Sequence, residues 1–223
     1  MWAVVPLKSP EHAKTRLAGV LSAVQRRQLL FVLAERAIRA LHATPGIDGV
    51  AVVTASKEVA EFAGRLGAQS IPQLEENGTA DAFSSAVRHL KPLALQSLLM
   101  IAGDLPLIST EALQQLIARA DSQPGVIVVP DRHRLGTNAL LCAPPDVMAP
   151  HFGNNSFRLH LRAAEASGVA AQVFDLPELT LDLDVADDLE FLRTHYEERA
   201  QHLLHALQYS ESGALSRRVA GAN

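Results

Sequence analysis

The sequence predicts an α/β domain in which helices flank both faces of a mixed, mostly parallel β-sheet. Short apolar runs alternate with amphipathic helical patterns through the first 130 residues or so. The runs are apolar throughout, which indicates strands covered on both faces, as in a parallel sheet between helices. The alternation loosens after residue 130, and we find no internal repeat, linker or second domain.

Capping signals divide the first part of the chain into elements. Ser22 and Gln25 form a capping-box pattern that begins a helix, and Pro45-Gly46 ends it. Ser56 caps the next helix, which Gly67 ends. We expect strands at 2–7, 50–53, 69–74, 98–102 and 126–129, and helices at 22–44, 56–66, from 79 or 81 to 90, and from 109 or 110 to 117.

The remaining elements are predicted from shorter patterns. Strands are expected at 138–142, 169–174 and 179–184, with helices at 157–166 and 186–207. We therefore place one domain at 1–208. The small, polar segment 209–223 is expected to be a flexible tail.

Composition narrows the class of protein. The 223 residues are 48% apolar and 20% charged, and the formal charge is −4, so the chain lacks the basic excess typical of nucleic-acid or membrane-surface binders. Cys142 is the single cysteine, which favours a cytoplasmic protein without an intramolecular disulfide. The apolar N-terminal run is too short for a signal peptide, and no stretch has the length of a membrane span.

Asp104 is the first candidate for chemistry. It follows a strongly apolar strand and Gly103, so it should lie at the carboxyl end of a central strand, where α/β sheets bind their ligands. The alternative is an ordinary turn at the end of a strand, where aspartate is common.

Asp182 and Asp184 are the second candidate. In an expected strand, a spacing of two places both carboxylates on one face and Leu181 and Leu183 on the other. Neighbouring carboxylates repel unless a cation lies between them, and Mg²⁺ prefers such oxygen ligands. A solvated edge strand is the alternative. Asp187-Asp188 is expected in the first turn of the last helix, where its charges favour the helix dipole.

Cations and small residues supply the candidate anion contacts. Lys8, Lys14 and Arg16 follow the first strand at the same sheet edge and could neutralise a triphosphate, although a solvated basic loop explains them equally well. Neither a P-loop nor a dinucleotide fingerprint is present. Gly153 and Ser156 precede a helix whose N–H groups could bind an anion, unless Ser156 only caps that helix.

The sequence also lacks a clear nucleophile with a partner base. Cys142 lies in an apolar run, and His133 and His151 have no evident acidic partner in the sequence. Attack by a substrate phosphate needs no strong base, because the attacking oxygen is already ionised. Positioning and charge neutralisation can then supply most of the catalysis.

Six motifs in order resemble the 2-phospholactate guanylyltransferase family of deazaflavin coenzyme (F-420) biosynthesis. One such motif would be weak, but six in the same order are specific. The resemblance runs from Trp2 to about Leu192. The motifs are PLK at 6–8, AKTRL at 13–17, GDLPL at 103–107, GTNAL at 136–140, FGNNS at 152–156 and LDLD at 181–184.

The resemblance implies a Rossmann-like nucleotidyltransferase (GT-A-like) fold and transfer of GMP from GTP to a small phospho-acid. It further implies a magnesium cofactor, with two ions expected. By this resemblance, magnesium is held by Asp104, Asp182 and Asp184, the GTP phosphates face Lys8, Lys14 and Arg16, and the acceptor contacts Thr137, Gly153 and Ser156.

The resemblance does not fully define either the nucleotide or the acceptor. Relatives often have Gly-Leu-Asn near the base pocket where this chain has GTAD at 78–81, which weakens the assignment of guanine. Phosphoenolpyruvate, 2-phospholactate and 3-phosphoglycerate all fit as acceptors. We favour 3-phosphoglycerate, because His151 beside the acceptor site could bind its extra hydroxyl, with Met100 as a second candidate contact.

Several alternatives stay open. The chain could be another sugar- or molybdopterin-type nucleotidyltransferase, a GT-A glycosyltransferase, or a non-catalytic nucleotide-binding module. We expect no nucleic-acid or membrane partner. A homodimer and transfer of the product to the next enzyme of the pathway are further expectations, which the sequence does not decide.

Overall fold

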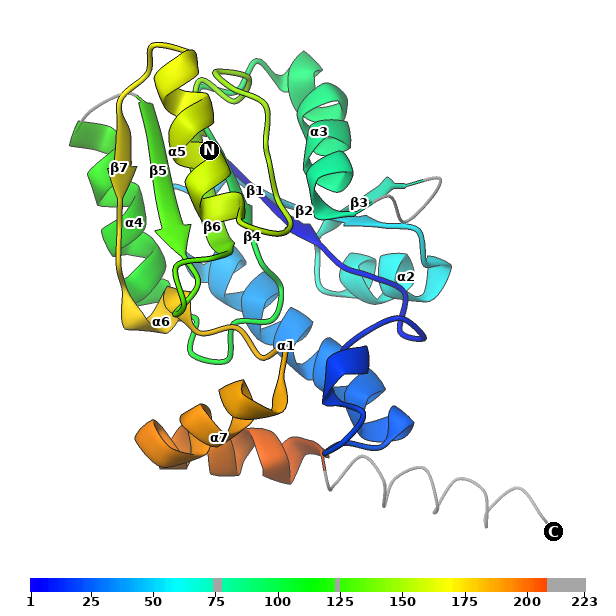
Figure 1. Cartoon of the computed structure of the whole chain (residues 1–223). Coiled ribbons are helices and arrows are strands. Elements are labelled where there is room, and N and C mark those ends of the chain that lie inside the picture. The colour runs from blue at the N-terminus through cyan, green and yellow to red at the C-terminus, as the bar shows by residue number, and fades with distance from the viewer. Residues whose placement is uncertain (74–77, 123–124, 208–223) are drawn as a thin grey trace, which may run out of the picture.

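A single twisted β-sheet forms the centre of the computed structural model, which describes residues 1–73, 78–122 and 125–207 (Figure 1). Its seven strands are ordered β3-β2-β1-β4-β6-β5-β7. The strands are β1 (Trp2–Pro6), β2 (Gly49–Thr54), β3 (Gln69–Pro72), β4 (Leu98–Ile101), β5 (Gly125–Pro130), β6 (Thr137–Ala143) and β7 (Ala171–Val173).

Only β6 runs against its neighbours. It pairs antiparallel with β4 and β5, whereas the β1–β2, β1–β4, β2–β3 and β5–β7 pairs are all parallel. Because β6 is reversed, its first residues lie at the sheet edge where the other strands have their carboxyl ends. The predicted mixed, mostly parallel sheet is therefore confirmed.

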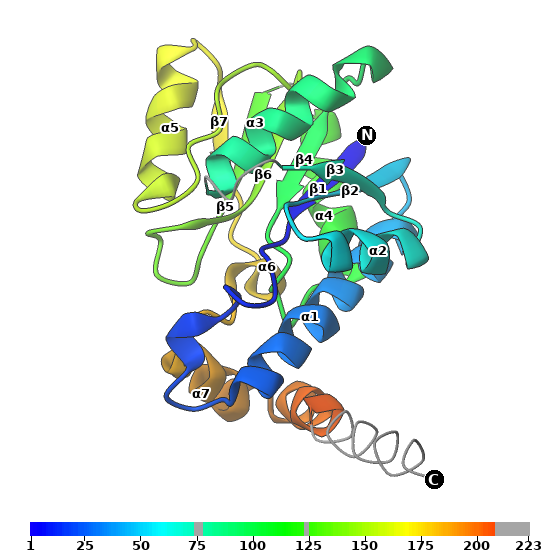
Figure 2. The same ribbon diagram turned by 90° about the vertical axis from the view of Figure 1, so that its right-hand side faces the viewer.

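Helices cover both faces of this sheet (Figure 2). Successive strand residues point to opposite faces, and Val5 packs with α1, α2 and α4 whereas Val4 packs with α3 and α5. The helices are α1 (Ala23–Ala43), α2 (Lys57–Arg65), α3 (Thr79–Leu90), α4 (Thr110–Ser122), α5 (Ser156–Ala166), α6 (Pro177–Thr180) and α7 (Ala186–His195), with 3-10 turns η1 (Thr15–Leu17) and η2 (Lys91–Leu93).

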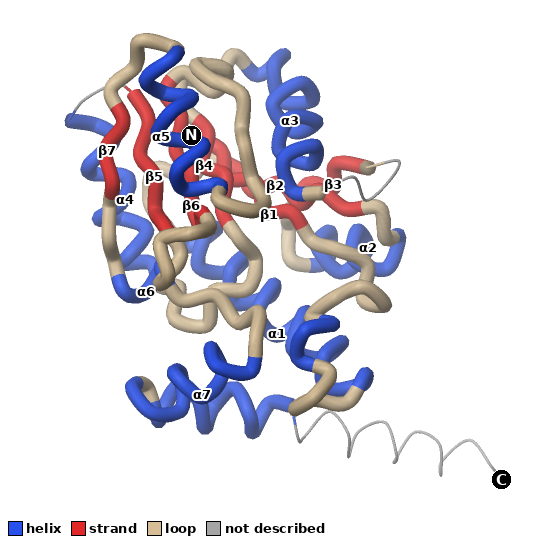
Figure 3. The backbone as a smooth tube through the Cα atoms, viewed as in Figure 1, coloured by secondary structure: helices blue, strands red, loops and turns tan. Residues whose placement is uncertain are grey.

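A third apolar cluster lies beyond the sheet edge, where α7 and the chain around η1 meet the start of α1 (Figure 3). Leu17 and Leu29 pack there against Leu181, Leu183 and residues of the last two helical segments. The cluster therefore brings the loop after β1 beside the segment that follows α6. None of the described helices is long and apolar enough to cross a membrane.

The predicted strand at 179–184 is wrong. Pro177 begins the short helix α6, and residues 181–184 then form an extended segment without a ladder partner. Its alternation in burial is nevertheless as expected, since Leu181 and Leu183 are buried and the two aspartates face away from them. Any extended chain over an apolar surface gives this period, so the pattern could not distinguish a strand from a packed loop.

Two helix boundaries also differ from the prediction. The final helix is interrupted at Tyr196, whose φ of −139° and ψ of 53° are not helical, and a second helical segment covers 197–207. The interruption lets Leu192 and Leu203 reach the same apolar cluster. Ser156 is the first residue of α5 and does not cap it, because Asn155 occupies the N-cap position. The expected tail at 209–223 lies outside the described residues.

Candidate active site

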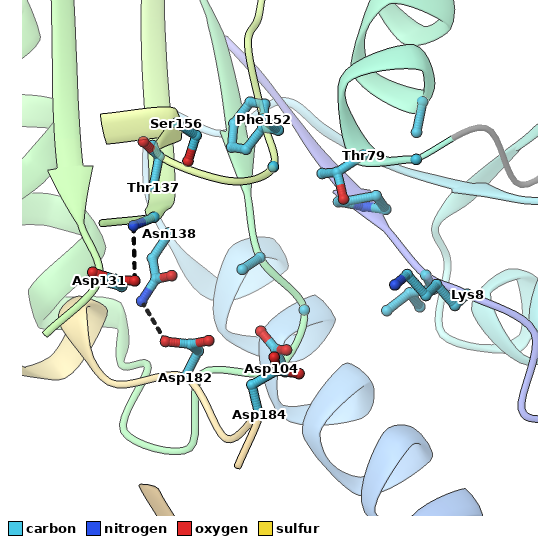
Figure 4. Close-up of a pocket in the computed structure, with 18 of the residues that line it drawn as sticks. Lys8, Thr79, Asp104, Asp131, Thr137, Asn138, Phe152, Ser156, Asp182 and Asp184 are labelled. Carbon is cyan, nitrogen blue, oxygen red and sulfur yellow. Dashed lines mark hydrogen bonds between the residues drawn. The ribbon is translucent and has the colours of Figure 1, made fainter. Parts of the chain in front are cut away.

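A cavity of about 850 Å³ opens at the carboxyl ends of β1, β4 and β5 (Figure 4). Loops after β1 and β4, the start of β6 and the loop before α5 form its walls. Nine residues that the sequence singled out line this one cavity: Lys8, Lys14, Arg16, Asp104, Thr137, Gly153, Ser156, Asp182 and Asp184.

Two residues named as acceptor contacts lie elsewhere. His151 is exposed and is not among the cavity-lining residues. Met100 is fully buried in the core under α3. Neither placement supports the contact for which the residue was named. Cys142 is buried as expected, and burial raises the pKa of its thiol to about 12.

Lys14 is the central cation of the site. Its backbone is left-handed (φ 54°), and its side chain, only 7% exposed, hydrogen-bonds the Asp104 carboxylate. Its ammonium also lies 3.8 Å from Asp184 Oδ1, and Arg16 binds the other oxygen of Asp184 at 2.8 Å. Although burial lowers the pKa of Lys14, the charges of Asp104 and Asp184 outweigh burial and raise it above its ordinary value.

Of the three aspartates, Asp182 is the one whose negative charge is least compensated by neighbouring cations. Burial and the Asp104 carboxylate raise the pKa of Asp182 to about 7, against the opposing effect of Lys14. The Asn138 amide donates to Asp182 Oδ1 at 3.4 Å and to the carbonyl of Thr180 at 2.9 Å. These two bonds hold the chain around Asp182 against the start of β6. A cation placed here would relieve the cost of ionising this carboxyl group.

The carboxylates match the ligand chemistry of magnesium, a hard cation that binds carboxylate and phosphate oxygens. Asp104, Asp182 and Asp184 face one cavity, and Lys14 is within 4 Å of two of them. Within the described ranges, however, no three acidic, histidine or cysteine side chains are arranged as a metal site. Instead, the Lys14 ammonium lies within 4 Å of both Asp104 and Asp184 and offsets their charge.

An ion-pair network that the sequence did not reveal supports Asp184. Asp188 Oδ2 accepts from the backbone N–H groups of Asp184 (2.9 Å) and Val185 (2.8 Å), so Asp188 caps the start of α7. Arg132 holds Asp188 Oδ1 through Nε at 3.0 Å and also pairs with Asp187. The first-turn position expected for both aspartates is confirmed. Arg132 is remote in sequence, and no local motif indicated its role.

Asp131 organises the loop between β5 and β6. Its carboxylate accepts backbone N–H bonds from His133 (3.1 Å), Leu135 (2.9 Å) and Gly136 (2.8 Å). Gly136 has no room for a side chain, because an added Cβ would lie 2.8 Å from Asp131 Oδ2. The loop therefore delivers Thr137 to the cavity wall in a fixed position (Figure 4).

Thr137, Gly153 and Ser156 form the opposite wall, which we call the acceptor wall. Gly153 has a φ of 122°, a conformation that side chains rarely allow, and Asn155 is left-handed at φ 57°. Together they turn the chain into α5, and the N–H of Ser156 bonds the Gly153 carbonyl at 3.2 Å. Gly153 and Ser156 therefore line the cavity at the start of α5, where the N–H groups of Ser156 and Phe157 are bonded to the carbonyls of Gly153 and Leu135.

Comparison with known proteins identifies the family of the chain. A family described as guanylyl transferase CofC like matches residues 1–220. The chain is 37% identical over 193 residues to phosphoenolpyruvate guanylyltransferase of Conexibacter woesei, which covers 86% of both chains. It is 33% identical to 3-phospho-D-glycerate guanylyltransferase of Colwellia psychrerythraea, covering 85% of this chain and 89% of the relative. It is 30% identical to 2-phospho-L-lactate guanylyltransferase of Methanothermobacter thermautotrophicus, covering 93% and 91%.

Solved structures show the same fold at low identity. A nucleotide-diphospho-sugar transferase from Desulfovibrio desulfuricans has a TM-score of 0.72 at 15% identity, covering 97% of this chain and 96% of the other. The family model and the relatives show that the chain is a nucleotidyltransferase, and its fold is the one that this solved structure has. Within that class, the chain belongs to the CofC-like guanylyltransferase family, as the motifs in its sequence indicated.

Proposed function

We propose that this protein transfers GMP from GTP to a small acid that carries both a phosphate and a carboxylate. The observation that carries the proposal is the pairing of two unlike walls in one cavity. Lys14, Arg16 and the three aspartates form one wall, and the acceptor wall of Thr137, Gly153 and Ser156 forms the other. A triphosphate and a smaller anion can therefore be held side by side.

In the proposed reaction, a phosphate oxygen of the acceptor attacks the α-phosphorus of GTP. The bond from that phosphorus to the β-phosphate bridging oxygen breaks, and pyrophosphate leaves with the electron pair. Lys8, Lys14 and Arg16 offset the charge of the triphosphate, while the acceptor wall fixes the direction of attack. No general base is required, since the attacking oxygen is ionised, and positioning and electrostatics supply the catalysis.

Magnesium is the proposed cofactor, with Asp104, Asp182 and Asp184 as its protein ligands and two ions in the loaded site. When bound, magnesium supplies charge neutralisation at the reacting phosphates. The chain's own part is to hold three carboxylates at one rim and to provide Lys14, which occupies that rim between Asp104 and Asp184. The unusual pKa of Asp182 supports the assignment, because this carboxylate needs a cation to stay ionised at low cost.

The choice of acceptor is argued from the relatives and not from a residue of the cavity. The preference for 3-phosphoglycerate depended on His151, which does not line the cavity. Relatives named for phosphoenolpyruvate reach 37% identity, against 33% for the relative named for 3-phospho-D-glycerate. Phosphoenolpyruvate is therefore the acceptor to test first, followed by 3-phosphoglycerate and 2-phospholactate. A product made from any of these acceptors would be a diphosphate diester. We further propose that this reaction belongs to coenzyme F-420 biosynthesis.

The test combines each of the four nucleoside triphosphates with each acceptor in the presence of Mg²⁺. We expect pyrophosphate release only with GTP plus a phospho-acid, and a product whose mass equals acceptor plus GMP less water. Release with CTP or UTP and a sugar phosphate would instead indicate another nucleotidyltransferase. Transfer of sugar from a nucleotide sugar, without pyrophosphate, would indicate a glycosyltransferase.

A further inference from the structure

A buried histidine joins the two parts of the acceptor wall. His160 on α5 is fully buried, and its Nδ1 lies 2.9 Å from the Thr137 hydroxyl oxygen. Its Nε2 lies 2.8 Å from the backbone nitrogen of His151, in the loop that leads to Gly153. One imidazole therefore contacts both the first residue of β6 and the loop before α5.

These contacts define the tautomer of His160. A backbone N–H can only donate, so Nε2 must accept from His151 and carries no hydrogen. Burial, with a smaller effect of His151, lowers the pKa of His160 to about 4, so the ring is neutral near pH 7. The single ring hydrogen is then on Nδ1, which donates it to Thr137 Oγ1.

This direction leaves the hydrogen of the Thr137 hydroxyl without an acceptor inside the described part of the protein. Thr137 lines the cavity, so that hydrogen can be donated to an anion bound there. A hydrogen bond from a hydroxyl to a phosphate or carboxylate is charge-assisted and about twice as strong as a neutral one. The opposite tautomer would turn the Thr137 hydrogen toward the ring and present only lone pairs to the anion.

We propose that His160 is a positioning residue that sets both Thr137 and the 151–155 loop to bind the anionic acceptor. The inference rests on the proposed function, because it assigns the acceptor to this wall. Phe152 supports the arrangement: its ring packs on His160 with centroids 4.8 Å apart and on Phe83 at 4.3 Å. Loss of the imidazole would therefore affect the orientation of one hydroxyl and the anchoring of one loop, both on the acceptor side.

Two substitutions distinguish this role from simple packing. His160→Phe keeps an aromatic ring but removes both hydrogen bonds, and we expect the acceptor KM to rise about tenfold or more. The KM for GTP should change by less than about twofold, because no GTP contact is proposed near this ring. His160→Gln should keep the acceptor KM close to that of the parent protein, since one amide can accept from His151 and donate to Thr137.

The inference is overturned if His160→Phe raises both KM values equally, or lowers kcat alone. It is also overturned if His160→Gln binds the acceptor no better than His160→Phe at the same melting temperature. Should His160→Phe not fold, Thr137→Val provides the test. This variant lacks the hydroxyl that His160 orients, so the acceptor KM should rise while the KM for GTP changes by less than about twofold, and equal rises in the two KM values would overturn the inference.

Nitrogen-15 NMR of the histidine rings gives a readout that needs no turnover. We expect His160 as the neutral Nδ1–H tautomer at pH 7, in the protein without substrates. A protonated Nε2 would overturn the inference even if GMP transfer is observed. If the wild-type protein transfers no nucleotide to any acceptor, the proposed function fails, and the NMR result still decides the tautomer.

Discussion

The backbone N–H of Leu183 donates a 3.2 Å hydrogen bond to the carbonyl oxygen of Asp104. This bond joins the turn after β4 to the extended segment after α6, and so holds Asp104 beside the segment that carries Asp182 and Asp184. The Leu183 side chain meanwhile packs into the cluster beneath the site. The acidic rim is therefore held by backbone and core contacts, so single changes to its carboxylates should leave the fold intact.

Asp104→Asn tests the rim most directly. We expect turnover to fall by about two orders of magnitude or more, because a neutral amide cannot balance cations at the reacting phosphates. Far-UV circular dichroism should match that of the parent. Asp48→Asn is the matched control, since Asp48 is exposed, pairs with the N-terminal amine and precedes β2 at the end of that strand opposite to the cavity. Near-normal activity of Asp104→Asn would refute the assignment of this carboxylate.

Lys14→Met tests whether the ammonium and magnesium compete for the same carboxylates. The substitution removes the cation between Asp104 and Asp184, so Mg²⁺ should raise the melting temperature more in the variant than in the parent. Turnover should still fall, because Lys14 is proposed to face the triphosphate. Arg39→Met is the control, since Arg39 is largely exposed and pairs with Glu35 within α1, away from the three aspartates. An equal Mg²⁺ shift in Lys14→Met and the parent would place the metal elsewhere.

Asp182 should make the protein less stable as pH rises. Its pKa is about 7 in the folded state against 3.8 ordinarily, so the folded state holds the proton more tightly. This contribution to stability is present below pH 3.8 and is lost as pH rises to about 7. Without divalent cations, Asp182→Asn should raise the free energy of unfolding by about 4 kcal/mol at pH 8. At pH 4 the variant and parent should unfold at the same denaturant concentration; a gain that is independent of pH would contradict the assignment.

Local signals in the sequence were enough to name several residues that the structure brings to one cavity. Asp104 follows directly after a buried strand, and strand ends collect ligands in this class of fold, so one position in the sequence was enough. The capping serines were equally local: Ser22 and Ser56 accept from the backbone N–H three residues on, as their motifs predicted. Such contacts depend on a few neighbouring residues and leave a pattern that can be recognised.

Residues that act across the fold left no such pattern. Arg132 reaches Asp188, 56 residues away, and nothing near either residue marks the pair. Asn138 belongs to a recognised motif, but its bonds to the last two carbonyls of α6 depend on the position of that helix. The strand expected at 179–184 failed for the same reason, because periodicity reports burial and not the partner that a backbone pairs with.

Asp188→Ala should separate the support of the acidic rim from its chemistry. Asp188 accepts two backbone N–H bonds at the start of α7, and loss of such a cap typically costs about 1 kcal/mol of stability. We also expect a lower kcat, because Asp184 loses the backbone bond that orients it. Asp187→Ala is the control, since it removes only an exposed partner of Arg132. Equal effects of the two changes would show that Asp188 does not position Asp184.

Gly153→Ala tests the acceptor wall through the backbone alone. An added Cβ would meet no heavy atom within 4 Å, so the substitution creates no clash with neighbouring residues. The φ of 122° is nevertheless strained for alanine, by about 1–3 kcal/mol, so the turn into α5 should relax and shift the cavity-lining residues Gly153 and Ser156. The acceptor KM should rise about tenfold while the KM for GTP stays unchanged. Gly64→Ala, at an equally open position inside α2, is the matched control and should be neutral or slightly stabilising. If Gly153→Ala weakens GTP and acceptor alike, the turn does not belong to the acceptor alone.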